Sequence, residues 1–519
     1  MADSIWELVS AALGRSPQQT AWVRRLSRGR RKEFSYAQIR DCALTLAHRL
    51  RLAGIESGDR VGILAPNGPE WGMAAIAVWK LGGVVAPLHT GNSDEELHAQ
   101  ANALDAKRIL YQGKDRGLRD TLEVHLDIDA DAVAAESAAE SAAGGDREAV
   151  RIYTSGSTGN PKMVRLSHRN IVSNVLSAAK LKIDIGSQDR FLSLLPLSHA
   201  MEMTGGMLLV LHKGATIVLP RMLAASEILD ALSEERITLM IGVPRLFRNL
   251  MLGLQKRFEE GGRLMHVYLA LLRGLPYPLR KFINQPIRNR LGGAIKCWLS
   301  GGSRLDPEIN RFFRELGLCV IQGYGLTECS PVVAVQIPGD PLLESVGRPL
   351  DGVEVKIHDP GQDGSGELWV RGPNVMLGYV DAEQTRKVMH DAWYKTGDIA
   401  RLVDGDKIVL TGRCKRLIVT EAGKNVYPED LEIILERNPS LKEAGVVEVD
   451  MRPAVVLAID PPNQIEKAKA ILKEFNARVS SHNHIGRFAV VDELPRTALG
   501  KVALKALPGI FAENEVSTT

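Results

Sequence analysis

Hydrophobic and polar positions along residues 1–125 follow two different periods in turn. Apolar residues recur at helical spacing over Tyr36–Leu52, and the short apolar run Arg60–Leu64 has the length of a strand. The apolar stretch Met73–Leu88 is interrupted by Lys80 and by two glycines, which indicates a buried helix followed by a strand. This alternation predicts a mainly parallel sheet covered by helices, so the expected fold class is α/β.

The pattern changes twice further along the chain. Residues 346–410 are rich in short alternating runs and tight turns, which indicate a small β-barrel or sandwich lobe. Near Arg413 the pattern becomes that of a compact α+β module. We therefore expect a large N-terminal domain, residues 1–413, built from two α/β sheet subdomains plus the small β-barrel lobe. A small α+β C-terminal domain, residues 414–519, follows it.

Composition excludes several classes of protein. The chain has 519 residues, enough for more than one domain, and 65 basic against 62 acidic residues give a net charge of +3. That balance does not favour a nucleic acid as a partner. The cysteines are an odd number, and no two of them have metal-ligand spacing, so free thiols in a reducing compartment are expected. They are Cys42, Cys297, Cys319, Cys329 and Cys414.

No targeting or membrane-spanning segment is expected. The first fourteen residues lack a basic start followed by an apolar core, and no run reaches the roughly 18 apolar residues that a membrane span needs. Residues 245–295 are rich in Arg, Lys and Leu; an amphipathic helix pair is the simpler interpretation, and a segment lying on a membrane surface is the alternative. We expect a cytoplasmic protein with, at most, peripheral membrane contact.

A loop of small residues follows the β-branched run that ends at Tyr153. Small residues let the backbone approach a ligand and point several N–H groups at it, while the hydroxyls and Lys162 add donors and a positive charge. This is chemistry for a polyphosphate, although the Walker A spacing is missing and a Ser/Gly linker is the alternative. The candidate residues are Thr154, Ser155, Gly156, Ser157, Thr158, Gly159 and Lys162.

Other candidate loops follow expected strands. Ser300–Ser303 follows the run 295–299, and Gly323–Glu328 follows Cys319–Gln322. Ligands of open α/β sheets bind at such strand ends. His199 also stands at a strand end, and on its own it reads more simply as a structural histidine.

The order of these loops resembles that of the adenylate-forming superfamily of acyl-CoA synthetases, peptide-synthetase adenylation domains and luciferases. The resemblance covers nearly the whole chain. It is carried by the motifs Tyr153–Lys162, Gly323–Glu328, Tyr394–Asp398, Gly412-Arg413 and Gly500-Lys501. The stretches Pro196–Glu202, Ser300–Leu305, Val243–Phe247 and Val419–Glu429 look most like the bacterial medium- and long-chain fatty acyl-CoA ligases.

The resemblance implies an ATP site. Residues 154–159 and Lys162 would hold the β- and γ-phosphates, Thr327 would meet the α-phosphate, and Glu328 with Thr154 would hold Mg²⁺. Tyr324 would offer a flat face to adenine, with core packing as the alternative. Asp398 would accept from the ribose hydroxyls, with a turn role as the alternative. The remaining implied nucleotide-binding residues are Gly301, Gly302, Ser303, Gln322, Gly323, Gly325 and Arg413.

The resemblance also implies two reaction steps. Lys501 would bridge the attacking carboxylate and the α-phosphate, and His199 would belong to the carboxylate pocket. The C-terminal domain would be mobile and rotate between two poses, so that CoA can attack the acyl-adenylate. Lys415 would be the hinge, with a plain exposed charge as the alternative, and Gly423 would line the thiol tunnel.

The expected activity is that of an ATP- and Mg²⁺-dependent ligase that makes acyl-AMP and then acyl-CoA. Its expected partners are a small carboxylic acid, ATP and CoA. The apolar stretch Met201–Gly206, with room at its glycines, favours a medium- or long-chain fatty acid. Alternatives are an enzyme that stops at the adenylate or loads an acyl-carrier protein, a ligase for an aryl or β-hydroxy acid, and a non-catalytic nucleotide-binding scaffold.

Three features depart from the family pattern. Met163 stands where relatives usually have glycine, and the chain after Val449 enters the next strand almost directly where relatives have a longer loop. The Ala-, Glu- and Asp-rich residues 127–148 have no assigned counterpart, and we expect a low-complexity surface connection there.

Overall fold

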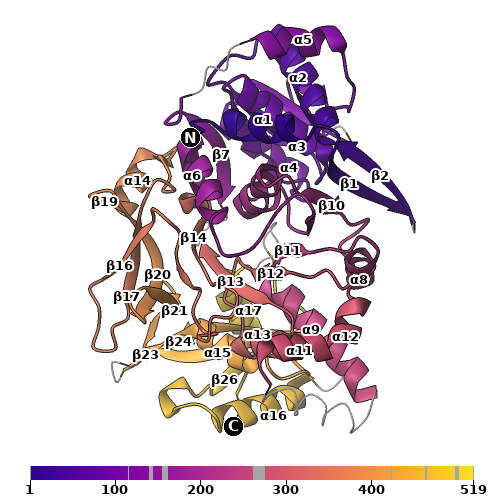
Figure 1. The fold of residues 1–519 in the computed structure, drawn as a ribbon. Helices are drawn as coiled ribbons and strands as arrows, with labels where there is room; N and C mark the ends of the chain where they lie inside the picture. The colour runs from indigo at the N-terminus through magenta and orange to yellow at the C-terminus, as the bar shows by residue number, and fades with distance from the viewer. Residues whose placement is uncertain are drawn as a thin grey trace.

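The computed structural model describes residues 2–27, 29–114, 116–139, 144–154, 162–260, 275–421, 424–461, 464–496 and 502–517. Several predicted site residues lie outside these ranges: Ser155, Gly156, Ser157, Thr158, Gly159, Gly423 and Lys501. Within the described residues the chain forms two large sheets, a strand-rich lobe and a C-terminal α+β module (Figure 1).

The first large sheet has seven strands in the order β18-β8-β7-β4-β3-β5-β6. Its strands are β18 (Gly378–Tyr379), β8 (Lys162–Ser167), β7 (Glu148–Thr154), β4 (Val84–Pro87), β3 (Arg60–Leu64), β5 (Arg108–Tyr111) and β6 (Thr121–Glu123). Strands β7, β4, β3, β5 and β6 run parallel. The predicted strand Arg60–Leu64 is therefore confirmed, as is the parallel arrangement.

The second large sheet has nine strands in the order β15-β14-β13-β12-β11-β9-β10-β1-β2. They are β15 (Arg348–Pro349), β14 (Val332–Val335), β13 (Val320–Gly325), β12 (Cys297–Ser300), β11 (Leu239–Gly242), β9 (Arg190–Leu192), β10 (Thr216–Leu219), β1 (Thr20–Ser27) and β2 (Arg30–Ser35). From β13 to β1 all neighbours are parallel, so the strand ends that carry the glycine loops meet at one edge.

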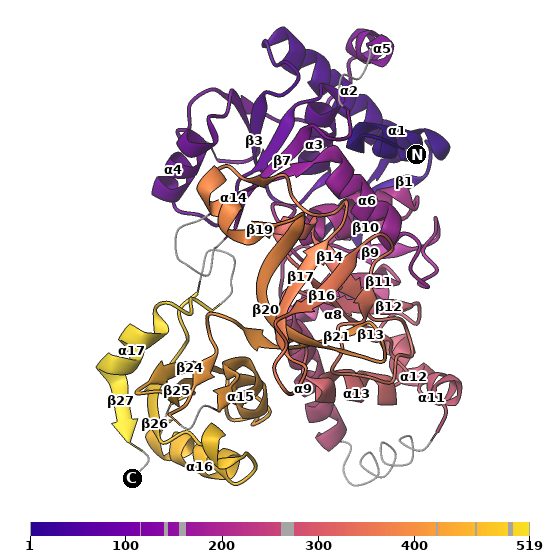
Figure 2. The ribbon, with the colours of Figure 1, turned by 90° about the vertical axis from the view of Figure 1, so that its left-hand side faces the viewer.

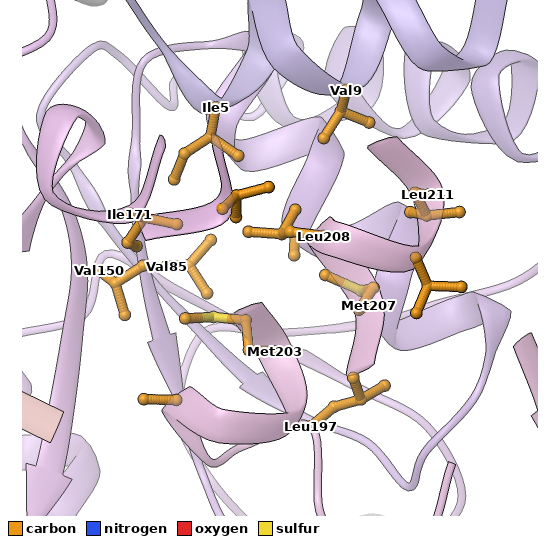
Figure 3. Packing of buried hydrophobic residues seen from close by; sticks show 14 of the residues in the cluster. Ile5, Val9, Val85, Val150, Ile171, Leu197, Met203, Met207, Leu208 and Leu211 are labelled. Atoms are coloured by element: carbon orange, nitrogen blue, oxygen red, sulfur yellow. The ribbon is translucent and has the colours of Figure 1, made fainter. Parts of the chain in front are cut away.

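Helices α1 (Ile5–Arg15), α2 (Tyr36–Leu52), α3 (Pro69–Lys80), α6 (His168–Ala178) and α7 (Leu209–His212) share one hydrophobic core with strands of both sheets. Every residue of α3 is buried, which explains why apolar residues occupy nearly all of its positions. Figure 3 shows side chains of α1, β4, β7, α6, α7 and the π-helical turn η1 (Glu202–Leu208) converging in this core. Ser35 caps α2 and Ser167 caps α6, each in a reciprocal capping box. α4 (Asp94–Leu104) lies on the smaller sheet.

A second core covers the other face of the nine-stranded sheet. α8 (Ala225–Glu234), α9 (Pro244–Glu260), α12 (Gln285–Arg290) and α13 (Pro307–Glu315) contribute to it, with α11 (Tyr277–Ile283) packed beside α12 and α13. Phe247, Trp298 and Phe313 meet there with ring centroids 5.9–6.3 Å apart. Among the described residues, no helix is both long and apolar enough to cross a membrane.

Residues 127–148 differ from expectation. The segment contains helix α5 (Ala130–Ala138), which packs on α2 and buries Glu136 against Arg51, with 3.2 Å between their charged atoms. The expected low-complexity surface connection thus includes a helix, because a run of alanine favours a helix once a neighbouring face can bury it.

The strand-rich lobe is one antiparallel sheet of five strands. They are β16 (Glu354–His358), β17 (Gly366–Arg371), β19 (Met389–His390), β20 (Trp393–Val403) and β21 (Lys407–Arg413), with α14 (Ala382–Val388) beside them. β20 and β21 matter most for the site, because their pairing sets Asp398 directly opposite Arg413.

The chain after β21 forms its own compact unit, drawn in orange to yellow in Figure 2. Its elements are β22 (Ile418–Val419), β23 (Asn425–Val426), α15 (Pro428–Leu435), β24 (Glu443–Val449), β25 (Arg452–Ala458), α16 (Gln464–Asn476), β26 (Arg487–Val491), α17 (Leu507–Asn514) and β27 (Glu515–Ser517). Two hydrophobic cores draw only on residues from Ile418 onward. The α/β fold with a small α+β unit at its end is as expected, whereas the boundary at residue 413 and the mobility of this unit stay predictions.

Candidate functional site

A cavity of about 2760 Å³ opens at the carboxyl ends of β11, β12 and β13 and extends to the C-terminal unit. Most of the predicted site residues that the structure describes line this one space. They are Thr154, Lys162, His199, Gly302, Ser303, Gly323, Tyr324, Gly325, Thr327, Glu328, Asp398, Arg413 and Lys415. The fold therefore brings together residues that lie more than two hundred positions apart in the sequence.

Two predicted residues take supporting positions beside the cavity. A Cβ atom at Gly301 would lie 2.7 Å from the sulfur of Met201, so a side chain at 301 would require the Met201 side chain to shift. Gln322 is buried and does not line the cavity. Its side chain accepts from the Leu305 N–H at 2.9 Å and donates to the Leu343 carbonyl at 2.8 Å. This geometry does not support nucleotide binding by the Gln322 side chain; it holds the loop after β12.

Asp398 is the centre of a charged cluster. Its carboxylate accepts a hydrogen bond from the Tyr324 hydroxyl at 2.7 Å and pairs with the Arg413 guanidinium at 3.0 Å. Asp398 is only 5% exposed. The carboxylate raises the pKa of Arg413, and burial together with that negative charge raises the pKa of Tyr324. The cluster presents polar groups that can pair with hydroxyls of a ligand.

Tyr324 is both buried and part of the cavity lining. The two interpretations of this residue, core packing and contact with a ligand, are therefore compatible in the structure.

Glu328 and Lys162 meet at a residue that sequence reasoning missed. The Tyr379 hydroxyl donates to Oε1 of Glu328 at 2.8 Å, and Nζ of Lys162 lies 4.6 Å from the centroid of the Tyr379 ring. Burial and the Glu328 charge raise the pKa of Tyr379. Tyr379 reaches this place because β18 pairs with β8, which begins at Lys162. No local pattern in the sequence predicts that β18 pairs with β8.

The donor set fits Mg²⁺ bound mainly through phosphate oxygens. No group of three or more His, Cys, Asp or Glu side chains suited to a metal occurs among the residues described. A single carboxylate, Glu328, with the hydroxyl of Thr154, which lines the same cavity, matches a cation that prefers oxygen and keeps several water or phosphate ligands. Thr154 itself lies at the end of β7, where its Oγ1 donates to the Lys162 carbonyl at 3.4 Å.

His199 faces a second histidine. The rings of His89 and His199 stand edge to face with centroids 6.1 Å apart, and both line the cavity. The Gly91 N–H donates to Nδ1 of His89 at 3.0 Å, and burial lowers the pKa of His89. A neutral His89 thus carries its proton on Nε2. Sequence reasoning missed His89, although its position two residues after β4, at a strand end, was a usable signal.

Part of the cavity lining is apolar. These side chains come from the segment after α6 and from β9, β11, β12, β13 and β14. They include Leu181, Ile183, Ile185, Phe191, Ile241, Leu299, Ile321, Val332 and Val335. Such a lining accepts a hydrocarbon group and excludes water from it.

The C-terminal unit contacts the rest of the chain through arginines. Arg248 of α9 donates four hydrogen bonds, 2.7–3.1 Å long, to the backbone carbonyls of Glu436, Leu441 and Lys442. Arg437 pairs with Asp306 at 2.9 Å, and Arg304 pairs with Asp430.

Lys415 is exposed in the connection after β21 and also lines the cavity. Arg496 and Val502, which flank residues 497–501, line the cavity as well.

A family model described as AMP-binding enzyme matches residues 9–380. The chain belongs to this AMP-binding enzyme family. A long-chain-fatty-acid–CoA ligase of Mycobacterium bovis is 28% identical over 523 residues, covering 88% of this chain and 85% of that protein. A feruloyl-CoA synthase of Amycolatopsis sp. is 29% identical over 494 residues, covering 90% and 92%.

Solved structures give the same assignment. The o-succinylbenzoate CoA synthetase of Bacillus subtilis in complex with its acyl-adenylate intermediate is 25% identical, covers 97% of both chains and has a TM-score of 0.77. The expected superfamily is therefore confirmed. These relatives are adenylate-forming CoA ligases, and the acids in their names differ, so the family alone leaves the acid open.

Proposed function

We propose that this AMP-binding enzyme is an ATP-dependent acid–CoA ligase whose acid is a medium- or long-chain fatty acid. It would form acyl-AMP with release of pyrophosphate and then transfer the acyl group to CoA. The observation that carries the proposal is the single cavity, which joins the charged residues at the strand ends to a large apolar lining. An aryl acid is the second candidate, because a feruloyl-CoA synthase is as similar as the fatty-acid ligase.

In this proposal the Asp398 cluster holds the nucleoside. Asp398 accepts from the ribose hydroxyls, Arg413 keeps its carboxylate in place, and the ring of Tyr324 contacts adenine beside Gly302. Support comes from the burial of Asp398 and from its two existing partners, which hold the carboxylate in one orientation. A preorganised acceptor of this kind binds without first giving up water.

The first step brings two anions together. Lys162, beside Tyr379, would hold the β- and γ-phosphates with residues 154–159, and Thr327 would contact the α-phosphate. Mg²⁺, held by Glu328 and Thr154, would neutralise charge on the phosphates. Lys501 would place its cation between the carboxylate and the α-phosphate, where negative charge develops. His199 would orient the carboxylate.

The second step needs a thiol at the same carbonyl. The proposal assigns the hinge to Lys415 and the wall of the thiol tunnel to Gly423. The pairs that join the C-terminal unit to the N-terminal domain are arginine contacts rather than an apolar interface, which suits a contact that breaks and re-forms. An acyl-carrier protein is the alternative acceptor.

A panel of acids tests the proposal. Straight-chain acids of six to eighteen carbons, ferulate and a β-hydroxy acid are each incubated with ATP and Mg²⁺, with and without CoA. Pyrophosphate release is measured, and products are identified by mass. Without CoA, we expect the fatty acids to give acyl-AMP. With CoA present, we expect them to give acyl-CoA.

Other outcomes separate the alternatives. Preference for ferulate would favour the aryl ligase, and acyl-AMP that never becomes acyl-CoA would favour a carrier-protein acceptor. No acid-dependent pyrophosphate release from any acid would overturn the ligase proposal in favour of a scaffold.

A further inference from the structure

One buried carboxyl beside the cavity has no part in the proposed reaction. Glu202 begins the π-helical turn η1, and its side chain is completely buried. The Ser193 hydroxyl donates to Oε1 at 2.5 Å, whereas Oε2 has no hydrogen-bond partner among the described residues. No Lys, Arg or His in the described chain forms an ion pair with Glu202. An unpaired carboxylate is costly in such a place, and burial raises the pKa of Glu202 to about 8.

Glu202 holds one side of the segment that leads to His199. Ser193 follows β9, and Asn67 holds the same segment, with its Nδ2 3.3 Å from the Ser193 hydroxyl that donates to Glu202. Nδ2 of Asn67 also donates to the Leu195 carbonyl at 2.6 Å, and the Leu197 N–H donates to Oδ1 of Asn67 at 2.8 Å. The segment that leads to His199 is therefore held by the Asn67 amide and, through Ser193, by the Glu202 carboxyl.

The carboxyl also fixes the wall of the cavity. A Cβ atom at Gly206 would lie 2.6 Å from Cδ of Glu202 and 2.8 Å from both of its oxygens, so the carboxyl fills the space that a side chain at 206 would need. Met201, just before Glu202, and Thr204 and Gly205, between Glu202 and Gly206, line the cavity. Glu202 is thus the contact between the His199 segment and the turn that forms this wall.

We propose that Glu202, in its neutral form, is a positioning residue for the acid substrate, joining the His199 segment to the η1 turn. The inference rests on the proposed function, because the acid is the ligand that this wall would receive. The elements packed against η1 include α6, α7 and β11, and no ionisable group of the described residues acts on Glu202 by its charge. Its protonation is therefore set by burial, opposed by Ser193 and the Leu195 backbone.

The test compares Glu202→Gln, which keeps the shape without the titration, with Glu202→Ala. Glu136→Gln is the matched control, because Glu136 is also buried but lies on α5, packed against α2.

The acid and ATP dependence of pyrophosphate release is measured from pH 6.5 to 9.5. In the wild type we expect kcat/KM for the acid to fall above about pH 8, by roughly tenfold per pH unit at the limit, with KM for ATP unchanged. Glu202→Gln should lack this fall, and Glu202→Ala should raise KM for the acid about tenfold at every pH.

Hydrogen exchange of peptides covering residues 193–208 gives a readout that does not need turnover. Protection should drop in Glu202→Ala at all pH values and in the wild type above about pH 8, but not in Glu202→Gln. An alkaline fall shared equally by wild type and Glu202→Gln, or unchanged protection in Glu202→Ala, would overturn the inference. Absence of turnover in the wild type with every acid would instead count against the proposed function, and hydrogen exchange would still decide the role of Glu202.

Discussion

Asp398 and Glu202 are two buried carboxyls beside one cavity. They differ in what compensates each of them for the loss of contact with water. Asp398 faces the Arg413 cation and accepts from the Tyr324 hydroxyl. Glu202 faces a serine hydroxyl and a glycine, and no cation in the part of the chain that the structure describes acts on it. A buried carboxyl keeps its charge where a cation or several hydrogen-bond donors compensate for lost water. The comparison divides the cavity into a charged half suited to a nucleotide and an uncharged half suited to a hydrocarbon.

If the charged half drives the first step, removing its mobile cation has the largest effect. We expect Lys501→Ala to slow acyl-AMP formation on the order of a hundredfold to a thousandfold, because a charge aimed at the developing oxyanion is lost. Conversion of supplied acyl-AMP to acyl-CoA should be largely unchanged. Lys415→Pro should do the reverse, because proline fixes φ at the proposed hinge. Assays of each half-reaction check both variants, and equal loss of the two half-reactions would rule out a two-pose mechanism.

The second-largest effect is expected from neutralising Asp398, the carboxyl paired with Arg413, which should weaken nucleotide binding. Asp398→Asn keeps the size of the side chain but leaves Arg413 without its partner. We expect KM for ATP to rise on the order of tenfold to a hundredfold, since hydrogen bonds to a charged group are lost. KM for the acid serves as the internal control. A parallel rise in KM for both substrates would contradict the division of the cavity.

Glu328→Gln should have a more limited effect, confined to Mg²⁺. The variant keeps a side chain beside Tyr379 but loses the carboxylate, and we expect the Mg²⁺ concentration for half-maximal adenylation to rise about tenfold. Titration with Mg²⁺ at saturating ATP measures this. An unchanged midpoint and an unchanged maximal rate would remove Glu328 from the site.

The smallest expected effect on catalysis near neutral pH, and the clearest on stability, is at Glu202. A carboxyl whose pKa is raised from its ordinary value to about 8 takes up a proton on folding. The free energy of unfolding should therefore decline as pH rises from about 4.5 to 8, by at most about 5 kcal/mol, and then level off. In Glu202→Gln this part of the decline should be absent. Denaturant titrations of both proteins at several pH values measure the difference, and identical curves would mean that Glu202 is already ionised.

Local patterns were enough to predict much of the fold and many of the residues that line the cavity. The helix Tyr36–Leu52 and the strand Arg60–Leu64 have the predicted bounds, because periodicity and capping act over a few residues. The two glycine loops at strand ends were expected to lie at a ligand site, and residues of both loops line the cavity. Tyr379 could not be predicted, since it reaches Glu328 only through pairing of β18 with a distant strand.

Chemistry that depends on surroundings was equally beyond the sequence. The sequence near Glu202 does not indicate whether a cation lies nearby in the fold. The sequence near Ala130–Ala138 does not indicate that α2 provides a surface for this helix to pack on. Gln322 shows the opposite limit: a residue directly before a recognisable motif does not line the cavity and holds a neighbouring loop instead.

The hydrogen bonds from Arg248 to the C-terminal unit have a consequence for protein engineering. Its hydrogen bonds all end on main-chain carbonyls, at Glu436, Leu441 and Lys442. Every amino acid supplies the same carbonyl, so these hydrogen bonds do not depend on which side chains stand at those three positions. A C-terminal unit transplanted from a relative would meet the same attachment, provided that its backbone follows the same path after the helix corresponding to α15. An attachment of this kind allows the sequence of the C-terminal unit to diverge while its contact with Arg248 stays the same.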